Sequence, residues 1–401
     1  MEGGSELRRL VRIVGAVVFL DTMFYAVIAP LLPELSHQLH LSKLSAGLLT
    51  ASYPLGTLLA SLPGGVLAVR AGPRFALCTG LALLGCSTIA FGFLRTAVGL
   101  DAARFVEGVG GACSWSGGIA WLVAETPAER RGAMIGRAIA AAVGGSLFGP
   151  AIGALASATG RPALFCALAV AAGVLIVVTR RLPYRGAPSD QGLAMLARMV
   201  RKPSVAAGMW LMVLPALASG MINVLGPLRL HQFGAGAGAI GAVFLCAAAV
   251  EAAISPAIGS LSDRRGRIVP LRAGLVAATV TLLCFTAPRT AVVTGIVIVA
   301  IACSLSGFWA PAMAMLSDAA ETHRIDQGLA AALINLTWAG GQIIGSGGGG
   351  AIAKATGDLV PTAIAAGLCV LTLAAVTRAP RWLGAAEPAL GSTDLAHGEK
   401  I

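Results

Sequence analysis

Apolar residues fill twelve long stretches of this chain, and short polar segments separate the stretches. An α-helix of about 20 apolar residues spans the hydrocarbon core of a bilayer, and each stretch is close to that length or longer. The pattern predicts twelve transmembrane helices, over residues 10–33, 44–68, 74–94, 98–124, 133–157, 162–180, 205–228, 237–261, 268–287, 291–317, 328–353 and 359–378. We therefore expect an all-α membrane protein.

The composition supports a lipid environment. Apolar residues make up 57% of the chain and charged residues only 12%, whereas soluble domains carry about 25% charged residues. The formal charge of +11 could indicate a nucleic-acid partner. However, the basic residues lie in short loops, where they report membrane topology. We expect the lipid bilayer and no nucleic acid as a partner.

Basic residues fall mainly on one side of the predicted membrane. With the N-terminus in the cytoplasm, the inner segments hold 22 of the 29 Lys and Arg residues and the outer segments hold 6, while Arg104 lies within a helix. This asymmetry predicts that both termini are cytoplasmic. The excess of Arg over Lys, 25 to 4, indicates a GC-rich bacterial genome, so we expect a bacterial inner membrane. The basic N-terminus resembles a signal peptide, but the apolar run extends to Leu32 and contains Asp21, so we expect a retained first helix.

Segments of the first half recur in the second half. GGVLAVRAGPR from Gly64 matches a segment 194 residues later, GGSLFGPAIG from Gly144 matches one 196 residues later, and AVIAPL from Ala26 resembles one 197 residues later. A duplicated six-helix unit is typical of transporters that rock one half against the other. We predict six-helix bundles over 1–180 and 205–380, a cytoplasmic linker with an amphipathic helix over 181–204, and a disordered cytoplasmic tail over 381–401.

Four motifs carry a family resemblance. GSLSDRRGRIVPL from Gly259 is similar to the loop signature G-x-L-x-D-R-x-G-R-x-x-x-L of the major facilitator superfamily, although its first-half copy has Val69 in place of the aspartate. LDAARFVEGVGGA from Leu100 resembles the fourth-helix pattern of that superfamily, and GSLFGPAIG from Gly145 resembles the fifth-helix pattern of antiporters. FLDTMFYAVIAPLLP from Phe19 resembles the first helix of drug:proton antiporters and vesicular amine transporters. The combination is similar to the twelve-helix drug:proton antiporter family.

Ionisable residues within the predicted helices are candidates for proton coupling, because a charge at bilayer depth needs a polar interior or a partner. Asp21 could exchange a proton for a cationic substrate, or could form a structural hydrogen bond. Arg104 and Glu107 share a helix face. Arg104 requires a carboxylate, from Glu107 or Asp21, unless it snorkels to the outer headgroups. Glu251 could be a second proton site or an interhelical hydrogen-bonding group.

The loop signature implies a gate that charge pairs and helix dipoles close. Its candidate residues occupy equivalent loops of the two halves: Gly65, Arg70, Gly72, Gly259, Asp263, Arg264, Gly266 and Arg267. Val69 predicts a weaker tether in the first half, because no carboxylate stands there.

A Gly–Pro pattern interrupts the fifth predicted helix. The motif comprises Gly145, Gly149, Pro150 and Gly153. Its proline removes one intrahelical hydrogen bond and predicts a kink, and its glycines form a smooth stripe for packing against another helix. The eleventh predicted helix repeats the stripe with Gly341, Gly345 and Gly349. The antiporter resemblance implies that this contact seals the cavity against leaks.

Aromatic and polar residues within the helices are candidate cavity liners. A cation over a Trp face is favourable by about 0.5–2 kcal/mol, although each residue could instead be a packing residue or a membrane-interface anchor. The candidates are Tyr25, Trp115, Trp210, Asn223, Trp309, Asn335, Trp338 and Gln342.

These observations predict a monomeric transporter rather than an enzyme: a proton-coupled exporter of small cationic or amphiphilic compounds. We expect no cofactor, because the GxGxxG matches at Gly236 and Gly345 lack a βαβ context. We expect no metal, because the eight cysteines form no CxxC pair. Two alternatives stay open. One is a proton-coupled transporter of a polar metabolite such as a sugar or an amino acid, and the other is a non-transporting sensor or assembly partner.

Overall fold

The computed structural model describes residues 2–127, 131–182, 202–322 and 327–378. Within these ranges the chain is helical and contains no strand. Most of the predicted linker and all of the predicted tail lie outside the described residues, and so does the predicted amphipathic helix except at its last residues.

The first half of the chain forms six membrane-crossing segments from seven helices. They are α1 (Glu2–Ala26), α2 (Ile28–Gln38), α3 (Lys43–Arg70), α4 (Pro73–Phe93), α5 (Ala97–Glu125), α6 (Arg131–Thr159) and α7 (Arg161–Arg180). Helices α1 and α2 follow each other with one residue between them and form one segment. Two helix starts have side-chain caps, since Ser42 Oγ accepts from the Ser45 N–H and Thr96 Oγ1 accepts from the Gly99 N–H, each at 3.2 Å.

The second half repeats this arrangement. It contains α9 (Pro203–Gln232), α10 (Ala237–Arg265), α11 (Ile268–Cys284), α12 (Ala291–Thr322), α13 (Gln327–Ile343), the π-helical turn η2 (Ile344–Gly348), α14 (Gly349–Thr356) and α15 (Leu359–Arg378). Helices α13, η2 and α14 are continuous, so they form one segment. The π-helical turn contains Ser346, the residue that replaces the proline of the first-half motif.

The prediction of twelve helical segments is confirmed over the described residues. Nine of these segments are long and apolar enough to span a membrane by length and composition alone. Helix α11 has only 17 residues, the α13–η2–α14 segment is divided by its π-helical turn, and α5 carries Asp101, Arg104 and Glu107 among many glycines. The predicted and observed boundaries differ most at the first segment. This segment is predicted over residues 10–33, and in the structure it continues through α2 to Gln38.

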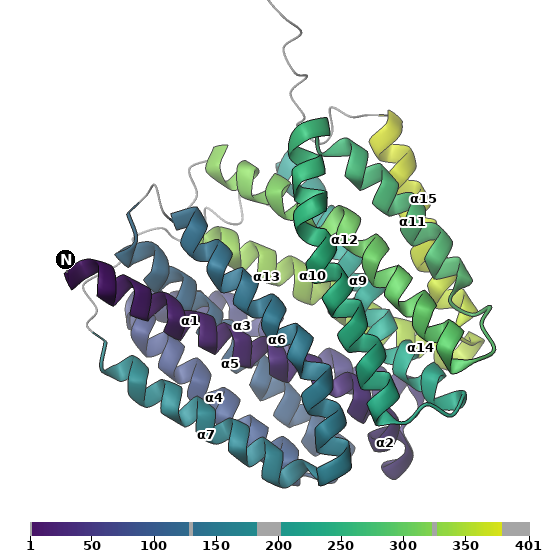
Figure 1. Cartoon of the computed structure of the whole chain (residues 1–401), viewed down its shortest axis with the longest axis horizontal. Helices are drawn as coiled ribbons and strands as arrows, with labels where there is room; N and C mark the ends of the chain where they lie inside the picture. Colours follow the sequence, from purple (N-terminus) through teal and green to yellow (C-terminus); the bar gives the residue numbers. More distant parts are fainter. Residues whose placement is uncertain (1, 128–130, 183–201, 323–326, 379–401) are drawn as a thin grey trace, which may run out of the picture.

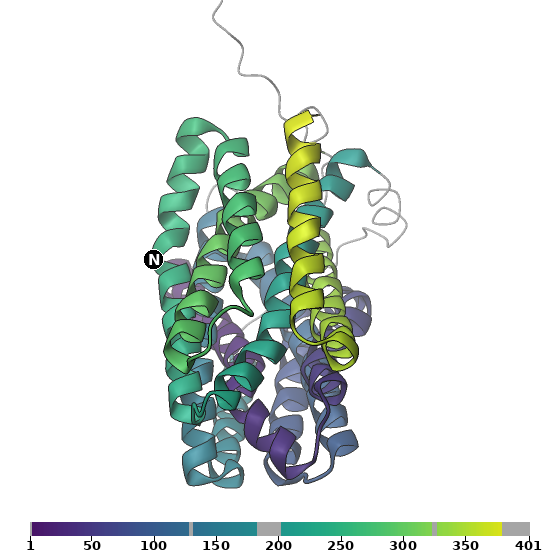
Figure 2. The ribbon, with the colours of Figure 1, turned by 90° about the vertical axis from the view of Figure 1, so that its right-hand side faces the viewer.

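The helices gather in two bundles that correspond to the two halves of the sequence (Figure 1). Figure 2 shows that the long helices run roughly side by side, as expected for segments that cross one bilayer. The bundles meet where α6 contacts α10, where α3 contacts α13 and α14, and where α2 contacts α9 and α10. Large apolar side chains on the outer faces are exposed, such as Val98, Val170 and Leu371, which fits a surface that faces lipid.

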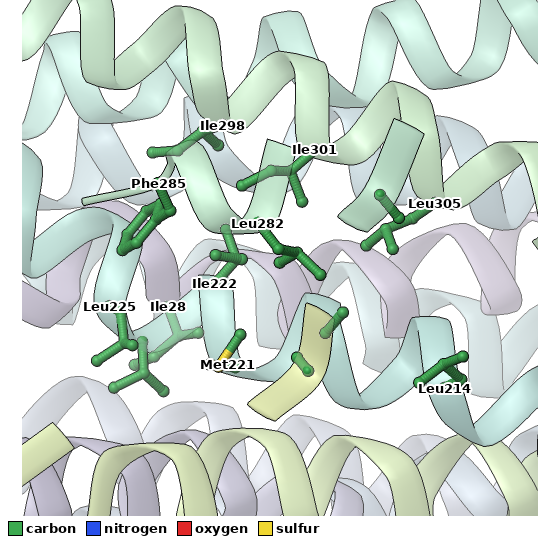
Figure 3. Close-up of a cluster of buried hydrophobic side chains, with 14 of the residues drawn as sticks. Ile28, Leu214, Met221, Ile222, Leu225, Leu282, Phe285, Ile298, Ile301 and Leu305 are labelled. Atoms are coloured by element: carbon green, nitrogen blue, oxygen red, sulfur yellow. The ribbon is translucent and has the colours of Figure 1, made fainter. Parts of the chain in front are cut away.

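Buried apolar residues form two clusters. One cluster lies within the first bundle and joins α1 to α4, α5 and α6. The other fills the second bundle and also includes Ile28, Leu31 and Leu35 of α2. Figure 3 shows Ile28 beside Leu225 of α9 in this second cluster. Helix α2 therefore belongs to the first half in sequence but is buried partly against the second half.

Candidate functional site

Asp21 lies in α1, and only 1% of the residue is exposed. Its Oδ1 accepts a hydrogen bond of 2.8 Å from the Tyr53 hydroxyl of α3, and its Oδ2 accepts one of 2.8 Å from Trp115 Nε1 of α5. Both donors are uncharged. Gly111 of α5 leaves the space for this carboxylate, because a Cβ there would lie 2.6 Å from Asp21 Oδ1.

Arg104 and Glu107 of α5 form a buried ion pair next to this carboxylate. Arg104 Nη1 lies 2.9 Å from Glu107 Oε2, and both residues are almost fully buried. The guanidinium also donates to the Phe24 and Tyr25 carbonyl oxygens at 2.9 and 3.1 Å. These carbonyls belong to the last turn of α1, where free acceptors favour a cation. Glu107 rather than Asp21 is thus the direct partner of Arg104, and the interpretation that Arg104 snorkels to the headgroups is wrong.

A cavity of about 240 Å³ lies between the two halves of the chain. Helices α1, α2, α3 and α6 supply its wall from the first half, and α9, α10, α12 and α13 supply its wall from the second half. The predicted site residues that line it are Tyr25, Pro150, Asn223, Glu251, Trp309, Trp338 and Gln342. Apolar residues make up most of the remaining wall, including Ile28, Phe244 and Ile298.

Tyr25 connects the cavity with the buried polar residues of the first half. Its hydroxyl accepts a hydrogen bond of 3.3 Å from Asn223 Nδ2 of α9, and its ring centroid lies 5.1 Å from those of Tyr53 and Trp338. Tyr53 in turn donates to Asp21. Asp21 itself does not line the cavity, and the side chains of Tyr53 and Tyr25 connect it with the cavity.

Three residues predicted to line the cavity lie elsewhere. The Trp115 indole points to Asp21 instead. Trp210 donates from Nε1 to Thr372 Oγ1 of α15 at 3.0 Å, so its indole is held against another helix of its own half. Asn335 of α13 is partly buried and lies outside the cavity wall.

The glycine stripe of α6 packs against the first segment. A Cβ at Gly149 would lie 2.5 Å from the Ala26 Cβ, and one at Gly153 would lie 3.2 Å from Pro30 Cδ. A Cβ at Gly145 would overlap the Phe19 carbonyl and the Thr22 hydroxyl. The stripe in the second half packs in the same way against α9, where a Cβ at Gly341 would lie 2.6 Å from the Val213 carbonyl. The predicted close helix contact is confirmed, while its sealing role stays a prediction.

The equivalent loops of the signature share a backbone feature. Gly72 has φ +92° and Gly266 has φ +79°, a conformation that favours glycine at each helix end. The side chains of Arg70 and Arg264 are exposed, and Arg267 is partly exposed.

Three other residues of the signature, Asp263, Gly65 and Gly259, give no evidence for or against the predicted gate. The Asp263 side chain lies outside the described part of the structure. A Cβ added at Gly65 or at Gly259 would meet no heavy atom of a neighbouring segment within 4 Å, so close packing does not require glycine at either position. The predicted charge-pair gate stays a prediction.

An ion-pair cluster at one end of the molecule links the two halves. Lys43 Nζ at the start of α3 lies 2.5 Å from Asp358 Oδ1, which precedes α15. Arg229 Nη1 in the last turn of α9 lies 3.6 Å from Asp358 Oδ2. Gly47 and Gly350 are in contact beside this cluster, where a Cβ at Gly350 would lie 3.2 Å from Gly47 Cα. We call this end of the molecule the Asp358 end.

Five of these residues were not predicted from the sequence. Tyr53 and Gly111 contact Asp21, and Lys43, Arg229 and Asp358 form the ion-pair cluster. A tyrosine hydroxyl within an apolar segment was an available signal for Tyr53, since the chain has only 3 tyrosines. No local pattern indicated the ion pairs of Lys43, Arg229 and Asp358, because each partner is more than a hundred residues away in the sequence.

Two six-helix bundles with a cavity between them are typical of one class of protein, the secondary transporters that are built from internal repeats. The sequence model of the Major Facilitator Superfamily matches residues 14–225 and 208–393. The chain therefore belongs to the major facilitator superfamily. This confirms the predicted family, and it places the chain in a family of transporters rather than enzymes.

Two transport and resistance proteins of other organisms are similar in sequence to parts of this chain. The synaptic vesicular amine transporter of Bos taurus is 30% identical over 331 residues, which cover 78% of this chain and 61% of the relative. The multidrug resistance protein 1 of Bacillus subtilis is 29% identical over 177 residues, which cover 43% of this chain and 45% of the relative. The chain thus spans about three fifths of the length of the vesicular relative.

Solved structures share the fold. A D-xylose-proton symporter superposes with a TM-score of 0.73 at 15% identity, over 92% of this chain and 97% of the symporter. A bacterial homologue of the human lysosomal transporter Spinster, in an inward-facing and unoccupied conformation, superposes with a TM-score of 0.75 at 14% identity, over 96% of this chain and 99% of that structure. At these identities the likeness concerns the fold alone.

Proposed function

We propose that this protein exports small cationic or amphiphilic organic compounds in exchange for protons, as a monomer in a bacterial inner membrane with both termini in the cytoplasm. In this proposal the halves 1–180 and 205–380 rock against each other and expose the cavity alternately to each side. The Asp358 end is then the extracellular end. The names of the vesicular amine and multidrug relatives support this class of substrate.

The position of Asp21 is the observation that carries the proposal. Two carboxylates are buried together in the first half, but Arg104 directly neutralises only Glu107. Asp21 is held by two uncharged donors, so its charge is not committed to an ion pair. A buried carboxylate of this kind is the group that can take up and release a proton as its surroundings change. Helix α1 links Asp21 with Tyr25 in the cavity wall, which connects protonation with the substrate pathway.

The cavity wall favours an amphiphile over a sugar. A sugar needs several hydrogen-bonding partners around its ring, because unpaired polar groups are costly to bury. Here Ile28, Ile222, Phe244, Ile298 and Leu305 form much of the wall. The amide groups of the wall already donate hydrogen bonds, Asn223 to Tyr25 and Gln342 to Ser219, and the xylose symporter supports only the fold.

Flux in proteoliposomes tests the proposal. With an acidic lumen, the outward proton gradient should drive accumulation of the cationic dye ethidium by the wild-type protein. Asp21→Asn should abolish this accumulation but keep gradient-independent dye exchange, because the variant can still alternate between its two conformations. Glu34→Gln is the matched control, since Glu34 contacts Ser157 and Gln38 away from the cavity. Wild-type accumulation by Asp21→Asn contradicts the coupling role, and proton movement driven by sugars but not by dyes favours the polar-metabolite alternative.

A further inference from the structure

Glu251 differs from Asp21 and Glu107, the two buried carboxylates of the proposed coupling site. It lies in the middle of α10 and lines the central cavity. Glu107 has Arg104 as its partner, and Asp21 has two hydrogen-bond donors. In the described part of the chain, the hydrogen bonds and ion pairs include none to the Glu251 carboxylate. Ser255 contacts only its backbone carbonyl, at 2.7 Å.

The sequence supplies no cation of its own for this carboxylate. Every Lys and Arg of the second half that the structure describes lies in a loop or near a helix end, and Arg104 of the first half is already paired. An ionised carboxylate at bilayer depth requires a cation or a water-filled surrounding. The cavity therefore presents a carboxyl group without a protein partner to whatever enters it, and a bound cation would stabilise its ionised form.

The rest of the cavity wall suits the body of an organic cation. Tyr25, Phe244, Trp309 and Trp338 line the same cavity as Glu251, and aromatic faces attract cations through their negative quadrupole. The two tryptophans and the phenylalanine also offer a large apolar surface to a hydrophobic ligand.

Gln342 is a second polar residue of the cavity wall with an unsatisfied group. It lines the cavity and only 3% of the residue is exposed. Its Nε2 donates to Ser219 Oγ at 2.9 Å, but its Oε1 is buried and has no hydrogen-bond partner. A buried acceptor without a partner is costly. This oxygen packs against α9, where a Cβ on Gly220 would lie 2.8 Å from it, so a ligand N–H could reach it only after the side chain turns.

We infer that Glu251 is the group that binds the positive charge of the substrate, in a cavity whose aromatic walls hold the apolar part of an organic monocation. This inference rests on the proposed function and divides its chemistry between two carboxylates. Asp21 takes up the proton within the first half, and Glu251 binds the cation within the second half. The substrate class is accordingly an organic cation rather than an anion or a neutral amphiphile.

Equilibrium binding of radiolabelled tetraphenylphosphonium to the purified full-length protein, at one fixed pH and without a gradient, tests the inference. Glu251→Gln keeps the shape of the side chain and removes its charge. We expect it to raise the dissociation constant at least about tenfold, since close pairs of opposite charges at binding interfaces contribute about that factor or more. Glu251→Asp should bind within a few-fold of wild type, and so should the control Glu34→Gln. Monodisperse elution and an unchanged Tm establish that each variant is folded.

The possible outcomes separate this inference from the proposed function. Equal binding by wild type and Glu251→Gln overturns the role of Glu251 alone, as does a loss of binding in Asp21→Asn instead of Glu251→Gln. If the wild type binds neither tetraphenylphosphonium nor ethidium, both the Glu251 site and the cationic substrate class of the proposed function are wrong. Proton-driven flux of a neutral amphiphile, measured separately, then decides whether the proposed coupling survives.

Discussion

The Nζ atom of Lys43 lies 2.5 Å from Oδ1 of Asp358, and this ion pair joins residues 315 positions apart. Lys43 begins α3 in the first half, and Asp358 precedes α15 in the second half. Arg229 is a further cation near the same carboxylate. In a protein whose halves move relative to each other, a charge pair that bridges the halves at one end favours the conformation in which that end is closed.

Removing this pair should shift the balance between conformations. Asp358→Asn leaves Lys43 and Arg229 without their shared carboxylate, so we expect greater opening at the Asp358 end. A cysteine introduced at Leu49, which is buried nearly two turns further along α3, should react several-fold faster with a membrane-impermeant maleimide. This requires a background in which the native cysteines are replaced.

The charge swap Lys43→Asp with Asp358→Lys should restore slow labelling, whereas either single reversal should not. Lys354→Gln is the control, because Lys354 is an exposed lysine at the same end of the molecule. Labelling that is unaffected by Asp358→Asn contradicts a role of the pair in closure. We expect little change in overall stability, since partly exposed ion pairs contribute about 0–1 kcal/mol.

The buried pair of Arg104 and Glu107 should matter more for stability. Arg104→Met leaves the Glu107 carboxylate and two α1 carbonyl groups without their donor. Breaking a buried ion pair by removing one partner costs about 3–5 kcal/mol. We expect a large fall in Tm or in the yield of monodisperse protein. The double variant Arg104→Met with Glu107→Gln should recover part of the loss, because no uncompensated charge remains; equal damage in the single and double variants argues against this explanation.

The packing of α6 against α1 should depend on Gly149. An alanine there brings its Cβ to 2.5 Å from Ala26 Cβ and 2.8 Å from the Met23 carbonyl. Overpacking of this kind costs about 1–3 kcal/mol, so we expect Gly149→Ala to lower Tm measurably. Gly173→Ala in α7 is the matched control, since a Cβ there meets no atom within 4 Å. Equal melting temperatures for the two variants contradict a tight α1–α6 contact.

The hydrogen bond from Trp115 to Asp21 should affect coupling without affecting the fold. Trp115→Phe removes the 2.8 Å donor to Oδ2, and Trp210→Phe removes an indole hydrogen bond of 3.0 Å that lies away from Asp21. A hydrogen bond to a charged group contributes about 1.5–3 kcal/mol. We expect Trp115→Phe to reduce gradient-driven ethidium accumulation about tenfold and Trp210→Phe to leave it near wild type. Similar fluxes in the two variants argue against the role of this bond.

The local pattern of the sequence predicts much of this protein. Segment length and apolar content identify the transmembrane helices, because lipid requires a continuous apolar stretch with its backbone hydrogen bonds satisfied internally. The repeat and the loop signature identify the superfamily. The glycine stripe at Gly145, Gly149 and Gly153 predicts a close helix contact, because small residues let backbones approach each other.

The orientation of side chains in the membrane comes only from the tertiary structure. These helices are apolar on nearly every face, so no amphipathic pattern fixes how each is rotated about its axis. For this reason the sequence could not decide that Trp309 faces the cavity while Trp115 faces Asp21, nor that Arg104 pairs with Glu107 rather than with Asp21. The contact between Lys43 and Asp358 likewise exists only because the start of α3 and the turn before α15 meet when the bundles pack together.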